Sequence, residues 1–88
     1  MHHDDGDHDN DPRAELVSVL QAMVAVPERV RVTASRRGRT TVFTAHLDQE
    51  DIGKVIGRQG RTARALRAVL DARGAYDRRS YRLELRED

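Results

Sequence analysis

Apolar residues recur with two different periods along the chain, and each change of period marks a new element. The first period is helical, and Asp11 and Pro12 before it are typical of an N-cap and a first helical turn. Pro27 is expected to end this helix, because a proline disfavours helical backbone in the residue before it. An amphipathic helix is therefore predicted from about residue 12. Its core-facing positions are Leu16, Val17, Leu20, Met23 and Val24.

Three later segments alternate with period two, which predicts strands with one buried face. The turn between the first two is Arg36-Arg37-Gly38-Arg39, where Gly38 can adopt a positive φ, so these strands should form a hairpin. The inward positions are Val30, Val32 and Ala34 in the first strand, Phe43, Ala45 and Leu47 in the second, and Tyr81, Leu83 and Leu85 in the third.

Two helices are predicted between the second and third strands. Asp48 can cap a short one that Gly57 ends, and a second runs from about Arg61 to Arg73 with Gly74 as its C-cap. Its inner face comprises Ala63, Leu66, Val69 and Leu70. In the order α-β-β-α-α-β, the last strand returns by a right-handed crossover parallel to the second. This predicts an α+β domain, a three-stranded mixed sheet with helices packed on one face.

Composition restricts the possible functions. The 88 residues allow one domain, and the absence of cysteine excludes thiol catalysis and zinc fingers. No phosphate-loop motif, HExxH motif or paired carboxylates indicate an enzyme, so we expect no catalysis and no cofactor. The three aromatic residues are too few for a base-stacking platform. No membrane span or signal peptide is visible, which predicts no membrane association and a cytoplasmic location.

The formal net charge of +1 conceals a strong asymmetry along the chain. Residues 1–11 carry five aspartates and no basic residue, whereas residues 12–88 carry all 16 basic residues against ten acidic ones. We interpret residues 1–11 as a disordered acidic tail that could compete with phosphates, and residues 12–88 as a basic domain. His2, His3 and His8 could chelate a metal with these aspartates, but a solvated tail is favoured and no metal site is assigned.

Fifteen of the 16 basic residues are arginine, whose planar guanidinium suits phosphate. Four basic residues surround a Gly57-x-x-Gly60 turn that joins the two predicted helices: Lys54, Arg58, Arg61 and Arg64. The N-terminus of the second helix also directs N–H groups at this turn. A bare Gly-x-x-Gly can be a purely structural turn, but this context favours a clamp for a sugar–phosphate backbone.

The segment Val55-Ile56-Gly57-Arg58-Gln59-Gly60, in this order of elements, resembles the KH domain of type II. More narrowly, residues 14–87 resemble the small bacterial single-KH RNA-binding proteins of the KhpA type. The resemblance implies that Ile52, Val55 and Ile56 line the base-binding groove, with Val42 and Thr44 on its opposite wall. The RNA-binding residues that we predict are Lys54, Ile56, Gly57, Arg58, Gln59, Gly60, Arg61 and Arg64.

The same resemblance implies single-stranded RNA as ligand. It also implies a homodimer, or a heterodimer with a larger KH protein of the Jag/KhpB type. In that family the pair is linked to post-transcriptional control, RNA chaperoning and cell-elongation or cell-wall regulation. An alternative from the residues is a dimeric protein-interaction adaptor in which the Gly-x-x-Gly loop is not the main site, because a thin core and an open sheet face both favour dimerisation.

Overall fold

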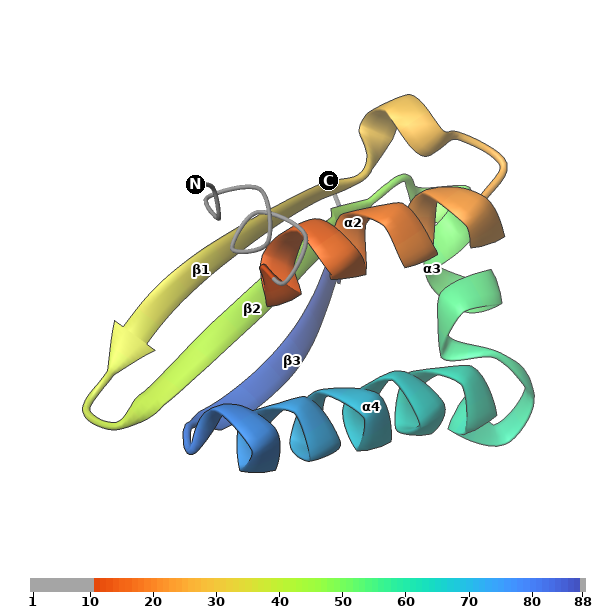
Figure 1. Ribbon diagram of the computed structural model, residues 1–88. Helices are drawn as coiled ribbons and strands as arrows, with labels where there is room; N and C mark the ends of the chain where they lie inside the picture. The colour runs from red at the N-terminus through yellow and green to blue at the C-terminus, as the bar shows by residue number, and fades with distance from the viewer. Residues whose placement is uncertain (1–10, 88) are drawn as a thin grey trace, which may run out of the picture.

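The computed structural model describes residues 11–87, with Arg58 described in its backbone alone (Figure 1). Residues 1–10 of the predicted tail, with its three histidines, lie outside the described residues, whereas Asp11, the last residue of that predicted tail, is described. The α-β-β-α-α-β order is confirmed, with two short 3-10 turns added. The elements are α2 (Pro12–Met23), η1 (Pro27–Arg29), β1 (Arg31–Arg37), β2 (Thr40–Leu47), α3 (Gln49–Ile56), η2 (Arg58–Gly60), α4 (Arg61–Asp77) and β3 (Ser80–Glu87).

The three strands form one mixed sheet with β2 in the centre. β1 pairs antiparallel with β2, and β3 pairs parallel with β2 after the crossover through α3 and α4. The hairpin turn has Gly38 at φ +63°, in the first central position of a two-residue connection, as a type II′ turn requires. The helices cover one face of the sheet (Figure 1), so the predicted α+β architecture is confirmed.

The core lies between that sheet face and the helices. Phe43 and Tyr81 meet there edge to face, with ring centroids 5.3 Å apart and an interplanar angle of 74°. The buried cluster comprises Leu16, Leu20, Val32, Phe43, Ala45, Leu47, Val55, Leu66, Leu70 and Leu83. Within residues 11–87, no helix has the length and hydropathy that crossing a membrane requires.

The first helix begins as predicted and ends earlier. The Asp11 carboxylate accepts the Arg13 backbone N–H at 3.0 Å, so it is the N-cap. The helix ends at Met23, and Pro27 opens η1 instead of ending α2. Met23, predicted in the core, is 37% exposed because it lies in this last turn. Ala34 is likewise exposed, because β1 continues past the helices toward the hairpin turn (Figure 1).

The predicted end of the last helix is wrong by one turn. Gly74 lies buried inside α4, where a Cβ would come within 2.6 Å of the Arg79 carbonyl oxygen. The chain reverses instead at Arg78, whose φ is +58°. The N–H groups of Arg79 and Arg78 bond the carbonyls of Gly74 and Ala75, which is a Schellman motif. Val69, predicted on the inner face, is 67% exposed.

Candidate nucleic-acid interface

The Gly57–Gly60 turn is built from left-handed backbone. Gly57, Gln59 and Gly60 have φ values of +75°, +57° and +73°. The Gly57 N–H closes α3 by donating to the Gly53 carbonyl at 2.9 Å, and the Gly60 N–H donates to the Gly57 carbonyl at 3.2 Å. The chain thereby passes from α3 into α4 within four residues.

The two glycines of the turn serve different purposes. A Cβ on Gly57 would lie 2.5 Å from Thr62 Oγ1, so Gly57 is required for the close packing of α3 against the start of α4. Among the side chains that the structure describes, a Cβ on Gly60 would meet nothing nearer than an Arg64 guanidinium nitrogen at 3.8 Å. The backbone around Gly60 is therefore open, which is the condition for another backbone to approach it.

The N-terminus of α4 adds positive potential to this opening. Gly60 is its N-cap and has no side chain that could satisfy the first N–H groups of the helix. Gln59, Arg61 and Arg64 are exposed, and the Arg64 guanidinium lies over the turn. N–H groups and guanidinium groups are both hydrogen-bond donors of the kind that anions accept from. The predicted Arg58 side chain lies outside the described parts of the chain.

The hydrophobic residues of α3 divide between core and surface. Val55 is fully buried and Ile52 packs against the core, so both stabilise the fold. Ile56 is 39% exposed in the last turn of α3. Of the three residues expected to line a base-binding groove, Ile56 is therefore the accessible one.

The opposite wall of the groove is expected at strand residues near Val42 and Thr44, and the structure shows which way these two side chains point. Val42 and Thr44 alternate with Phe43 and Ala45, whose side chains are in the core, so they lie on the sheet face turned away from the helices. Val42 is buried there without belonging to the core cluster, between Ser35 of β1 and Arg82 of β3. α3 and these two side chains thus lie on opposite faces of the sheet.

Asp51 is the structurally important residue that the sequence analysis missed. Its carboxylate is fully buried and accepts the backbone N–H groups of Ala25 and Val26 at 2.9 and 3.0 Å. Lys54 Nζ is 3.9 Å from the same carboxylate, while the lysine side chain remains 59% exposed. Because the bonded partners lie 25 and 26 residues away, no local spacing in the sequence indicates this contact.

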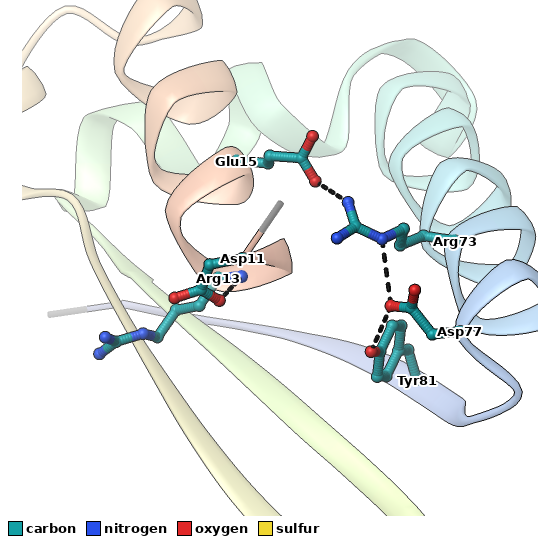
Figure 2. Close-up of polar contacts among 6 residues, drawn as sticks. All are labelled: Asp11, Arg13, Glu15, Arg73, Asp77 and Tyr81. Carbon is teal, nitrogen blue, oxygen red and sulfur yellow. Dashed lines mark hydrogen bonds and ion pairs between the residues drawn. The ribbon is translucent and has the colours of Figure 1, made fainter. Parts of the chain in front are cut away.

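A second polar cluster joins α2, α4 and β3 near the other end of α4 (Figure 2). Arg73 pairs with Glu15 and donates to Asp77 at 3.0 Å, and the Tyr81 hydroxyl donates to the same Asp77 oxygen at 2.7 Å. The hydrogen bond from Tyr81 lowers the pKa of Asp77, and Arg73 lowers it further. Burial and the Asp77 hydrogen bond raise the pKa of Tyr81. Burial alone would lower the pKa of Arg73, but the two carboxylates raise it.

Comparison with known proteins gives a consistent family. A family model described as KhpA/KhpB, KH domain, matches residues 13–85. A protein of Leifsonia xyli named RNA-binding protein KhpA is 40% identical over 73 residues, which cover 83% of this chain and 93% of that protein. Proteins of the same name from Streptomyces coelicolor and Halalkalibacterium halodurans are 40% and 39% identical, over 80% and 76% of this chain and 85% and 88% of their own lengths.

Proposed function

The chain belongs to the KhpA/KhpB family of KH domains, and on that premise we propose that it binds single-stranded RNA by holding the sugar–phosphate backbone at the Gly57–Gly60 turn. The observation that carries the proposal is the open backbone at Gly60, beside the uncapped N-terminus of α4 and the Arg64 guanidinium. These groups offer hydrogen-bond donors and positive charge to phosphates, and contacts with phosphates carry no sequence information. The binding is therefore weakly selective for sequence.

Each predicted residue has a defined role in this proposal. Gly57 and Gly60 shape the turn, and Arg58, Gln59, Arg61 and Arg64 supply donors to the phosphates. Lys54 adds charge from α3, and Ile56 offers an apolar contact to a base. No step of bond making or breaking is involved, so the protein acts by binding and not by catalysis.

The experiment that tests the proposal compares two variants with the same change of charge. Arg58→Asp/Gln59→Asp alters the turn, and Arg13→Asp/Gln21→Asp alters two exposed positions of α2. Aspartate tolerates the left-handed backbone at position 59, so the turn variant should fold. Fluorescence anisotropy of a labelled single-stranded RNA at two salt concentrations reports affinity and salt dependence, and thermal unfolding reports the fold.

We expect the turn variant to lose binding and the α2 variant to retain it. The dependence of log affinity on log salt should fall by about 0.7 for every phosphate of a single strand that the variant no longer binds. Equal affinities of the two folded variants would show that the turn is not the binding site.

The resemblance to the small single-KH proteins supports a wider role for this binding. On that ground we place the protein in the cytoplasm, in post-transcriptional control or RNA chaperoning linked to cell elongation and cell-wall organisation. A change in the abundance of bound transcripts after loss of the turn residues would test that placement.

A second candidate function, association through an apolar surface, is favoured by a depression between α2 and α4. Val19 and Val69 border it and are 46% and 67% exposed. We propose that a second copy of the chain covers this surface, and a larger KH protein of the Jag/KhpB type is the other candidate partner. Light scattering after size exclusion, with and without RNA, separates an RNA-dependent module from a dimer that is indifferent to RNA.

A further inference from the structure

The β1–β2 turn and the connection from α4 to β3 meet at one end of the molecule, and the Gly57–Gly60 turn lies at the other (Figure 1). Thr40 and Ser80 are paired in the sheet, and the Thr40 hydroxyl donates to Ser80 Oγ at 3.3 Å. This contact holds the two connections together. Side chains that are some forty residues apart in sequence therefore share one surface.

That surface is an open depression of about 620 Å³ with strong positive charge. Among the described residues that line it, Asp77 is the one acid, and its carboxylate is already bonded by Arg73 and Tyr81. We call the four arginines that line the depression the hairpin-end arginines. They are Arg36, Arg39, Arg78 and Arg79.

The backbone fixes two of these arginines in place. Arg78 has a φ of +58°, a left-handed conformation that glycine adopts freely and that is strained for an arginine. The Schellman hydrogen bonds, from Arg79 N–H to Gly74 at 2.8 Å and from Arg78 N–H to Ala75 at 3.3 Å, hold both residues at the end of α4. An arginine with a strained backbone, at a position where glycine would fit better, indicates that the side chain of Arg78 has a function.

We propose that the hairpin-end arginines form a second phosphate-binding site for the RNA strand that the Gly57–Gly60 turn holds. This inference rests on the proposed function. α4 has 17 residues and a length of about 25 Å, so a strand that is bound at both sites must span about this distance. Arg64 and Arg67 lie one turn apart on α4 between the turn and the depression, and the Arg67 guanidinium also donates to the Leu83 carbonyl at 3.4 Å. Asp71 follows one turn later, so the positive charge along α4 is concentrated at its two ends. Guanidinium groups bind phosphate oxygens bidentately, so this end suits a nucleic-acid backbone.

The acidic residues before Asp11 are the ligand against which RNA must be tested at the depression. They are Asp4, Asp5, Asp7 and Asp9 of the predicted tail. Glu15, one turn further along α2, already pairs with Arg73 of α4. Carboxylates of the tail and phosphates of RNA would compete for the same guanidinium groups, so the test must distinguish the two.

The test uses the full chain and two RNA lengths. An RNA of four nucleotides fits the turn alone, and one of about twelve also reaches the depression. Arg78→Gly/Arg79→Gln removes two charges, and glycine at 78 suits the left-handed backbone. Arg29→Gln/Arg86→Gln removes two exposed charges outside the depression as a matched control. Arg58→Asp/Gln59→Asp reports on the proposed function itself.

For Arg78→Gly/Arg79→Gln we expect about ten-fold weaker binding of the longer RNA and a salt slope lower by about 1.4, with binding of the shorter RNA unchanged. The control pair should bind both RNAs nearly as the wild type does. If the hairpin-end variant matches the control on the longer RNA, the inference is overturned while the proposed function stands. If Arg58→Asp/Gln59→Asp still binds the shorter RNA, the proposed function fails instead.

The effect of the tail is measured by replacing its four aspartates by asparagine, in the wild type and in Arg78→Gly/Arg79→Gln. If tail carboxylates and RNA phosphates compete for the hairpin-end arginines, the replacement should tighten binding of the longer RNA more in the wild type than in Arg78→Gly/Arg79→Gln. An equal gain in both backgrounds would contradict competition at the depression.

Discussion

The fully buried carboxylate of Asp51 accepts the backbone N–H of Val26 at 3.0 Å, and its other oxygen accepts the Ala25 N–H at 2.9 Å. Asp51 lies in the first turn of α3, and its partners lie in the segment between α2 and β1. The contact therefore fixes the helix that leads into the Gly57–Gly60 turn against a segment distant in sequence. The position of the proposed RNA site depends on this buried polar contact.

We predict that Asp51→Ala destabilises the fold by about 2–4 kcal/mol, because it leaves two backbone N–H groups without their acceptors. Asp51→Asn retains one acceptor oxygen and should lose less. Glu50→Ala, an exposed acid in the same turn, is the matched control and should change the free energy of unfolding by less than about 0.5 kcal/mol. Urea unfolding measures all three. Equal stabilities of Asp51→Ala and Glu50→Ala would contradict the structural role of Asp51.

Replacing each glycine around the turn by alanine should change the free energy of unfolding by amounts that follow a defined order. Gly57→Ala combines a positive φ with a 2.5 Å contact to Thr62, and we expect it to cost more than about 2 kcal/mol. Gly60→Ala has the positive φ without the clash and should cost about 1 kcal/mol. Gly53→Ala lies in open space within α3 and should stabilise by about 0.5–1 kcal/mol. Denaturant unfolding of the three variants checks the order, and a harmless Gly57→Ala would disprove the packing argument.

Local rules predicted most of the fold. The caps at Asp11 and Asp48, the hairpin turn at Gly38 and the break at Gly57 all depend on short-range backbone chemistry, and all are confirmed. The errors arose where tertiary contacts override local preference. Gly74 is a good C-cap by itself, but the return of β3 beside α4 makes it a close-packing position, and the reversal moves to Arg78.

The candidate site was predictable in its turn and less so in its surroundings. The Gly-x-x-Gly spacing locates the turn, because its glycines act locally. Which apolar residues of α3 are accessible depends on how that helix packs, and Val55 and Ile56 differ by one position yet lie in the core and at the surface. The hairpin-end arginines come from two connections that only the sheet brings together.

Tyr81→Phe should change how the free energy of unfolding depends on pH in the acidic range. The Tyr81 hydrogen bond is the main cause of the lowered pKa of Asp77. A lowered folded pKa stabilises above the unfolded value of about 3.9, and that stabilisation is lost as pH falls through the folded value. Without the hydroxyl, the loss of unfolding free energy between about pH 5 and pH 2 should be smaller. Tyr76→Phe, at an 85% exposed position, is the control. If the free energy of unfolding depends on acidic pH in the same way in both variants, the Tyr81 hydrogen bond does not stabilise the ionised form of Asp77.

Val69→Lys should disrupt self-association without unfolding the domain. Val69 is 67% exposed in the monomer, so a lysine there should change the free energy of unfolding by less than about 0.5 kcal/mol. In a dimer that covers the depression between α2 and α4, the same lysine would lose its water, and Glu15, the one acid among the described lining residues, is already paired with Arg73. The lysine should therefore strongly disfavour association. Ala68→Lys adds the same charge at an exposed position that does not line the depression.

Light scattering should find Val69→Lys monomeric at concentrations where the wild type and Ala68→Lys are dimeric. If Val69→Lys left the dimer intact, the depression between α2 and α4 would not be the dimer interface, because an apolar contact at this position cannot accept an uncompensated charge.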